Sequence, residues 1–155
     1  MSIVEEVELL RRIPLFAKID PTRLKLLAFT SDRVKFAPGQ TLFEQGENGD
    51  AAYVVIEGEA DVTVNTPSGP LSVATIRQHE LVGEIAILCD VPRTATVAAK
   101  TELVALRISD DLFHRLVTEF PDMAMEIMRD LARRLELTTA RLREAVVQGS
   151  PPAGG

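Results

Sequence analysis

The stretch from residue 33 to residue 108 is built from short apolar segments that Gly, Pro and Asn interrupt at close spacing. This texture is typical of an all-β sandwich or roll, because each segment suits one strand and each interruption suits a turn. Residues 59–66, EADVTVNT, alternate apolar and polar side chains, as expected for a strand with one buried face. Residues 51–58, AAYVVIEG, are almost continuously apolar and should form a more deeply buried strand.

Helices are predicted on both sides of this region, over residues 3–31 and 109–147. The first segment is amphipathic, and the second begins with a short helix and continues into a long one. Four residues suited to helix caps or first helical positions support these boundaries: Asp20, Pro21, Ser109 and Pro121. The expected fold is therefore mostly β with flanking helices, an antiparallel β-roll of the double-stranded jelly-roll type.

The long helix carries one narrow apolar seam with three-four spacing, formed by Met128, Leu131, Leu135, Thr138, Leu142 and Ala145. The seam could cover the roll, or it could form a parallel contact with a second copy. Because it spans little more than two heptads, its pattern does not distinguish these alternatives. We expect one domain over residues 1–148 and a flexible tail over residues 149–155, GSPPAGG.

Composition excludes several classes of function. A single cysteine, Cys89, excludes an internal disulfide framework and a Cys-rich metal site. The two histidines, His79 and His114, form no metal-ligand cluster with nearby carboxylates, so we expect no metal. No nucleophile stands beside a base, so we expect no enzyme activity. A net charge of −6 disfavours direct nucleic-acid binding. The acidic N-terminus and the absence of a long apolar run predict a cytoplasmic protein without membrane contact.

Residues 82–97, VGEIAILCDVPRTATV, combine a carboxylate at Glu84 with a guanidinium at Arg93. Gly83 permits a tight turn into a short helix over EIAIL, whose first amides and dipole would attract a small anion. Arg93 could add a planar fork of donors, and Glu84 could accept a sugar hydroxyl. These features together describe a nucleotide site without a metal. The alternative is that Glu84 and Arg93 pair only with each other and lock the helix to the sheet.

The order of these features resembles the cyclic nucleotide-binding domain family. GEIAILCDVPRTATV resembles the family's phosphate-binding cassette, PGQTLFEQGENGDAAYVVIEGEADV resembles its glycine-punctuated β-roll, and IPLFAKIDPTRLKLLA resembles its N-terminal helices. The resemblance covers about residues 10 to 145. It implies a roll with N-terminal helices, a cassette at residues 82–97 and a C-terminal helical lid.

The resemblance also implies roles for single residues. Glu84 would accept the ribose 2′-hydroxyl, Arg93 would bind the cyclic phosphate, and Thr94 would offer a hydroxyl to the phosphate or to a guanine amino group, which leaves cAMP and cGMP both open. The family's lid on the long helix lies over the purine, although Arg133 and Arg134 are better explained as a solvated charged face. The other implied contacts are the amides of Ile85, Ala86 and Ala95, the turn at Gly83, and Val82.

Three positions depart from the family pattern. His79 stands where the family often has Gly, which His tolerates because it enters positive φ more readily than most residues. Val82 replaces a frequent aromatic residue, and CDV, residues 89–91, replaces a loop that usually includes glycine. The family's transcription regulators carry a helix-turn-helix after the long helix; we expect none in this chain, so their DNA-binding role is not carried over.

The expected function is a freestanding receptor for cAMP or cGMP that moves its C-terminal helices to control an unknown protein partner or a second copy. A first alternative is a structural or interaction module that has the fold without the ligand. A second is a roll-type enzyme acting on a small anion such as a sugar phosphate, and a third is transcription control through a partner that supplies the DNA contacts.

Overall fold

Two four-stranded antiparallel sheets form a β-roll in the computed structural model, which describes residues 3–147. The strand orders are β1-β8-β3-β6 and β2-β7-β4-β5. This confirms the predicted fold class. The predicted tail at residues 149–155 lies outside the described residues. The strands are β1 (Asp32–Phe36), β2 (Thr41–Phe43), β3 (Ala51–Glu57), β4 (Ala60–Thr66), β5 (Gly69–Ile76), β6 (Leu81–Val82), β7 (Thr96–Ala99) and β8 (Leu103–Ser109).

The helices lie before, within and after the roll. Asp20 accepts a hydrogen bond from the amide of Arg23 at 3.1 Å, and Ser109 accepts one from the amide of Leu112 at 3.3 Å, so both predicted caps are confirmed. A short 3-10 helix between the two N-terminal helices was not foreseen. The helical elements are α1 (Ile3–Arg11), η1 (Pro14–Phe16), α2 (Pro21–Thr30), α3 (Glu84–Leu88), α4 (Asp110–Glu119) and α5 (Pro121–Val147).

Strand β3 is buried on both faces, as its continuous apolar sequence predicted. Its even-numbered side chains, including Val54, pack in a core with the N-terminal helices, α4 and the start of α5. Its odd-numbered side chains, including Tyr53, pack in a second core between the two sheets. Because β3 contributes to both cores, the strand fixes the helical layer relative to the interior of the roll.

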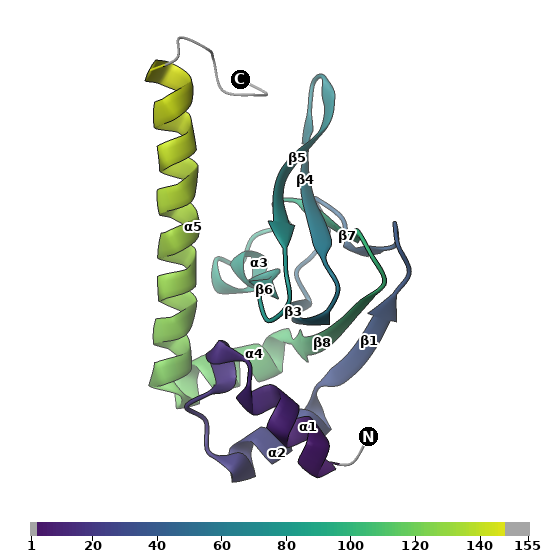
Figure 1. Ribbon diagram of the computed structural model, residues 1–155, viewed down its shortest axis with the longest axis vertical. Coiled ribbons are helices and arrows are strands. Elements are labelled where there is room, and N and C mark those ends of the chain that lie inside the picture. Colours follow the sequence, from purple (N-terminus) through teal and green to yellow (C-terminus); the bar gives the residue numbers. More distant parts are fainter. Residues whose placement is uncertain (1–2, 148–155) are drawn as a thin grey trace.

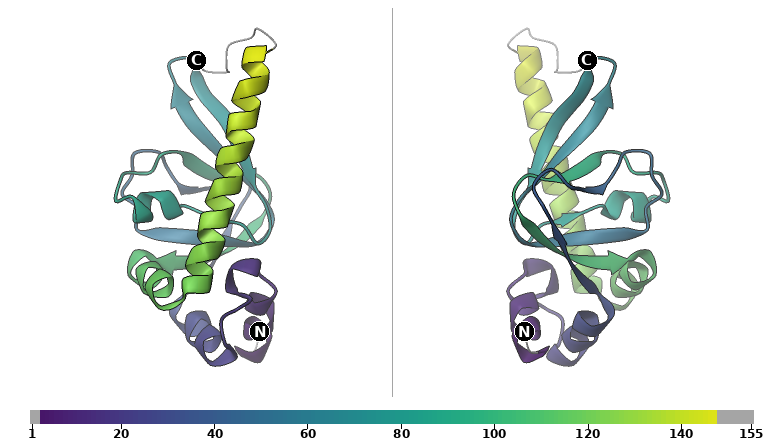
Figure 2. Two further views of the ribbon diagram at one scale, coloured as in Figure 1. Left: turned by 90° about the vertical axis from the view of Figure 1, so that its left-hand side faces the viewer. Right: turned by 90° about the vertical axis from the view of Figure 1, so that its right-hand side faces the viewer.

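Helix α5 runs along one side of the roll, from α4 and η1 toward the projecting β4–β5 hairpin (Figures 1 and 2). Its first turns are anchored, because Met123 and Ile127 are buried in the core shared with η1. The predicted apolar seam is only partly covered by the protein's own core. Leu131 packs against this core, whereas Met128, Leu135 and Leu142 are exposed.

Candidate ligand-binding site

The segment after β6 turns sharply into α3, which confirms the predicted short helix. Gly83 caps α3 with φ of 89°, a left-handed conformation that favours glycine. A Cβ at Gly83 would also lie 2.8 Å from Nη1 of Arg93. A Cβ at Gly49, in the loop before β3, would lie 2.6 Å from the Cβ of Ala86. Two glycines therefore allow Arg93 and the loop before β3 to approach α3 closely.

The Arg93 guanidinium is buried inside the roll and is held by it. Its Nη1 donates to the Gly83 carbonyl at 2.7 Å, and its Nη2 donates to the Ala51 carbonyl at 2.6 Å. Nη2 also lies 3.5 Å from Asp50 Oδ1, and the guanidinium carbon lies 3.9 Å from the centre of the Phe43 ring. Burial lowers the pKa of Arg93, and the charge of Asp50 opposes this shift.

One donor of Arg93 remains without a partner. Its Nε is buried and makes no hydrogen bond with any residue that the structure describes. A buried, unsatisfied donor is costly and needs an explanation. The backbone on either side is fixed, because the amide of Arg93 donates to Glu47 and its carbonyl accepts from Gly46, each at 2.8 Å. The side chain is thus a rigidly placed cation with unused hydrogen-bonding capacity.

Glu84 is buried at the first position of α3, with an exposed fraction of 1%. Its Oε1 accepts a hydrogen bond from Arg134 Nη1 of α5 at 3.3 Å. Arg134 Nη2 donates to the Leu81 carbonyl at 2.5 Å and lies 3.0 Å from Asp130. Burial raises the pKa of Glu84 above its ordinary value, although the charge of Arg134 acts in the opposite direction. A carboxylate of the roll is therefore paired with a cation of the C-terminal helix.

Two sequence-based interpretations are corrected by these contacts. The hypothesis that Glu84 and Arg93 pair with each other is wrong: within residues 3–147, the ion-pair partner of Glu84 is Arg134 and that of Arg93 is Asp50. The solvated face expected for Arg134 is also wrong, because this side chain is only 31% exposed and reaches back to the roll. Arg133, at 67%, does have the solvated position expected of it.

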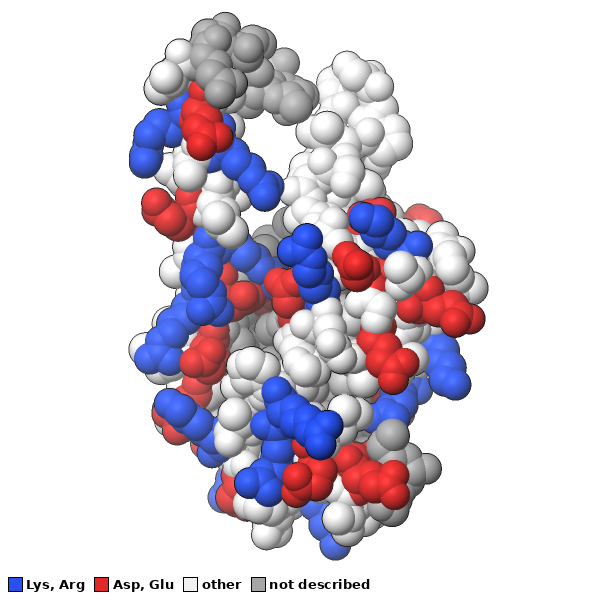
Figure 3. All heavy atoms as spheres, viewed as in Figure 1, with Lys and Arg blue, Asp and Glu red and all other residues white. Residues whose placement is uncertain are grey.

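A cavity of about 780 Å³ opens beside Glu84 and Arg93, between the cassette, the β4–β5 hairpin and α5. Figure 3 shows the surface hollowed in this region, with Lys and Arg side chains along the α5 side. All but one of the residues predicted for the site line this cavity: Val82, Gly83, Glu84, Ile85, Ala86, Arg93, Thr94, Ala95 and Arg134. Residues 85 and 86 occupy the first turn of α3, where backbone amides have no partner within the helix.

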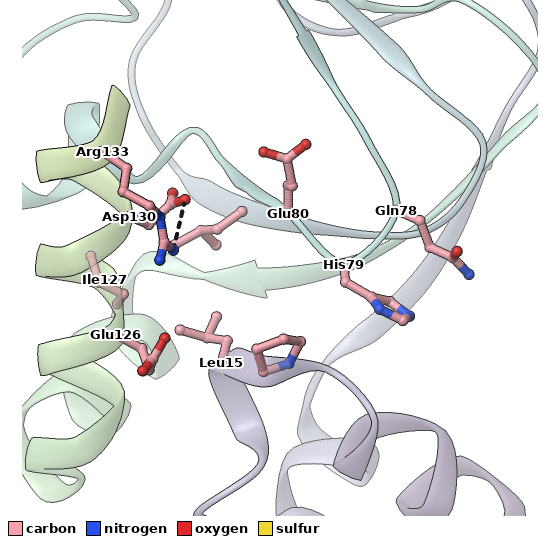
Figure 4. A pocket seen from close by; sticks show the side chains of 10 residues that line it. Leu15, Gln78, His79, Glu80, Glu126, Ile127, Asp130 and Arg133 are labelled. Atoms are coloured by element: carbon pink, nitrogen blue, oxygen red, sulfur yellow. Dashed lines mark ion pairs between the residues drawn. The ribbon is translucent and has the colours of Figure 1, made fainter. Parts of the chain in front are cut away.

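The exception is Arg133, which the structure does not bring to this cavity. It lines a separate cavity of about 310 Å³ between η1, the turn before β6 and α5 (Figure 4). There Arg133 pairs with Asp130 at 3.8 Å, near Glu80 and Glu126. Because carboxylates outnumber cations around this second cavity, it is not suited to a phosphate.

Several lining residues were missed by sequence reasoning. Phe43 comes from β2, and three come from α5, namely Leu137, Thr138 and Arg141. The signal for the α5 residues is their spacing from Ile127, Leu131 and Arg134, since residues three or four apart share a helix face. Asp50 has no comparable signal, because its proximity to Arg93 depends on the pairing of distant segments.

The departures from the family pattern coincide with unusual backbone positions. His79 has φ of 71°, which confirms that it adopts the positive φ allowed for it. Asp90, in the loop expected to include glycine, has φ of 51°. Asp enters this region more readily than most residues. The chain therefore keeps these turns without glycine, and Cys89 beside Asp90 is exposed.

No group of three or more His, Cys, Asp or Glu side chains between residues 3 and 147 is placed to hold a metal ion. In the same part of the chain, no helix is both long and apolar enough to cross a membrane.

The chain is similar to known proteins in sequence and in fold. The sequence model of the cyclic nucleotide-binding domain matches residues 33–120. A CRP-like cAMP-activated global transcriptional regulator from Mycobacterium tuberculosis is 29% identical over 145 residues, which cover 93% of this chain and 65% of the regulator. A cAMP-dependent protein kinase regulatory subunit from Yarrowia lipolytica is 39% identical over 108 residues, which cover 70% of this chain and 28% of the subunit.

The fold is also similar to that of a protein of known structure, by structural superposition. The crystal structure of the Thermus thermophilus catabolite activator protein superposes with a TM-score of 0.74 at 26% identity, covering 86% of this chain and 63% of that one. This chain thus spans less than two thirds of the length of each of these three proteins. The two sequence relatives are regulatory proteins by name. The match over residues 33–120 covers more than half of the chain, which belongs to the cyclic nucleotide-binding domain family.

Proposed function

We propose that this chain binds a cyclic nucleotide, cAMP or cGMP, and acts as a regulatory module without catalytic activity of its own. The observation that carries the proposal is the unpaired, buried Nε of Arg93 beside the first turn of α3. A cyclic phosphate is a compact monoanion that can accept from this donor and from the amides of Ile85 and Ala86. Thr94 and Ala95 also line this cavity.

Glu84 would bind the sugar. Its carboxylate can accept a hydrogen bond from the ribose 2′-hydroxyl. An ionised phosphate has no hydrogen to donate to this carboxylate. In the structure this carboxylate accepts from Arg134 of α5. A ribose that takes up part of the carboxylate's accepting capacity changes the contact that holds the middle of α5 to the roll. Ligand binding would then favour one position of residues 109–147 over another.

The purine would lie between the roll and α5. Val62 and Val82 offer apolar surface on the roll side, and Leu137, Thr138 and Arg141 face the cavity from the helix. Both Thr94 and Thr138 carry hydroxyls that can hydrogen-bond a purine edge. Neither hydroxyl by itself selects adenine over guanine, so both nucleotides enter the test.

Thermal melting with three nucleotides tests the proposal. We expect cAMP or cGMP to raise the melting temperature, since ligand at 100 times its dissociation constant adds about 2.7 kcal/mol of stability. 5′-AMP has the same base and sugar with an open phosphate dianion, and should give a much smaller shift. No shift with either cyclic nucleotide at millimolar concentration would contradict the proposal and favour a fold retained without its ligand.

We further propose that α5 pairs with α5 of a second copy. Met128, Leu135 and Leu142 follow one another at intervals of seven residues and are exposed by 54%, 68% and 46%. Met125 and Val146, also exposed, fall on the alternate position of the same heptad. This face is distinct from the face of Met123 and Ile127 that packs on the protein's own core.

Sedimentation equilibrium tests the pairing of α5. The unaltered chain should behave as a dimer, and Leu135→Glu should shift it to monomer because a charge would enter the heptad seam. Val4→Glu is the matched control, since Val4 is also 68% exposed but lies on α1. A monomeric unaltered chain, or a dimer that Leu135→Glu leaves intact, would contradict the proposal.

A further inference from the structure

Asp50 lies between two guanidinium groups at the edge of the candidate site. Its Oδ1 is 3.5 Å from Nη2 of Arg93, and its Oδ2 accepts a hydrogen bond from Nη2 of Arg107 at 3.1 Å. The Arg93 contact is longer than the ~2.7–2.9 Å of a close charge-assisted hydrogen bond. The shorter, better contact of this shared carboxylate is therefore with Arg107, which is not part of the cavity lining.

Arg107 is itself firmly placed. It lies in the middle of β8, paired in register with Asp32 of β1 and Tyr53 of β3. Its side chain is 30% exposed, and its Nη1 also lies 4.0 Å from the Asp32 carboxylate. Burial lowers the pKa of Arg107, but interactions with the side chains of Tyr53 and Asp50 outweigh burial and raise it. By contrast, the Asp50 side chain is 70% exposed.

We propose that Arg107 is a positioning residue for the phosphate-binding guanidinium and acts on it through Asp50. A carboxylate with both oxygens free tends to form a bidentate pair with a guanidinium. Such a pair would neutralise much of the Arg93 charge and compete with a phosphate for it. By holding Oδ2, Arg107 leaves only one distant oxygen for Arg93, so that the cation stays available to a ligand. This inference rests on the proposed function.

The simplest competing explanation is that Arg107 only adds positive charge near the site. A change of charge would act on a ligand whether or not Asp50 is present, whereas the proposed action requires the Asp50 carboxylate. A double-mutant cycle separates the two, because it measures whether the effect of one residue depends on the other. Asp50→Asn keeps the size of the side chain and removes the charge.

The experiment is calorimetric titration with cAMP and cGMP of the unaltered chain, Arg107→Ala, Asp50→Asn, the double variant and Arg107→Lys. Arg107→Ala should weaken binding by about 5-fold, which is about 1 kcal/mol. In the Asp50→Asn background the same change should alter affinity by less than about 1.5-fold. Arg107→Lys, which keeps a cation for Asp50, should recover most of the affinity. Arg11→Ala removes the same charge from α1, where Arg11 pairs with Glu8, and should bind normally.

Three results would overturn the inference in distinguishable ways. Equal losses on removal of Arg107 with and without Asp50 would show a general charge effect. Unchanged affinity in Arg107→Ala, together with a loss in Arg93→Lys, would exclude Arg107 and leave the proposed function intact. No binding by the unaltered chain would reject the proposed function and this inference with it. Urea unfolding of each variant shows that losses of affinity do not come from loss of the fold.

Discussion

Arg93 and Glu84 are the two buried charged residues of the described chain, and they are held by different parts of the molecule. Arg93 contacts the carbonyls of Ala51 and Gly83 and the carboxylate of Asp50, all within the roll and its loops. Glu84, nine residues earlier, pairs with Arg134 of α5. The position of the Arg93 side chain thus depends only on the roll. The ion pair of Glu84 depends on where the C-terminal helix lies.

This difference assigns separate tasks to the two halves of the site. The phosphate side is arranged before a ligand arrives, so little conformational freedom is lost when an anion binds there. The sugar side is shared with α5, so a ligand hydroxyl at Glu84 acts on a contact between the roll and the helix. A ligand must interact differently with two helix positions to shift their populations. The Glu84–Arg134 contact is where such a difference can arise.

The largest expected effect comes from a substitution on the phosphate side of the site, which the roll alone holds. Gly83→Ala should destabilise the fold by about 2–4 kcal/mol and abolish tight ligand binding, because it adds backbone strain and a contact 2.8 Å from Arg93 Nη1. Gly39→Ala is the matched control: its φ of 86° is similar, but nothing lies within 4 Å of the added Cβ. It should cost only about 1 kcal/mol. Urea unfolding measures both, and equal costs would show that Arg93 is not closely packed on Gly83.

A smaller effect is expected on the sugar side of the site, where Glu84 contacts α5. Arg134→Ala should destabilise the chain by about 1–2 kcal/mol, because Glu84 stays buried without its cation and the pair is only partly screened. Hydrogen exchange should accelerate in the middle of α5. Arg133→Ala removes the neighbouring, mostly exposed guanidinium and should change stability by less than about 0.5 kcal/mol. If the two variants behave alike, the Glu84 contact does not hold α5.

The smallest effect is a pH dependence. Because burial raises the pKa of Glu84 in the folded chain above the ordinary value of 4.5, the folded state binds this proton more tightly than the unfolded state. Stability from this group is complete below pH 4.5 and is lost as the pH rises through the raised pKa. Glu84→Gln does not titrate. The unfolding free energy of this variant, measured in urea, should therefore rise relative to that of the unaltered chain as the pH increases from 4.5 to neutrality. A constant difference would contradict the raised pKa.

Local patterns predicted most of the fold because they depend on neighbouring residues. The apolar texture of residues 33–108 indicated a roll, the caps at Asp20 and Ser109 marked helix starts, and Gly83 marked the turn into α3. His79 entered positive φ as its side chain allows. The partial covering of the α5 seam was not predicted, because how much of the seam meets the core depends on how the helix is docked.

The partners of the two buried charges were the main failure of sequence reasoning. Glu84 and Arg134 are 50 residues apart, and no local spacing links them. The position of Arg134 on the helix face of Ile127 and Leu131 was an available signal, and it distinguishes Arg134 from Arg133. The contact between Asp50 and Arg93 had no such signal, because it depends on the loop before β3 folding against the cassette.

The most direct test of the central claim is calorimetric titration of cAMP and cGMP into the unaltered chain and Arg93→Lys. Lysine keeps the charge but lacks the planar fork and the Nε–H donor, so we predict saturable binding by the unaltered chain and at least about 10-fold weaker binding by the variant. Equal affinity of the two proteins, or no heat from the unaltered chain at millimolar nucleotide, would contradict the account.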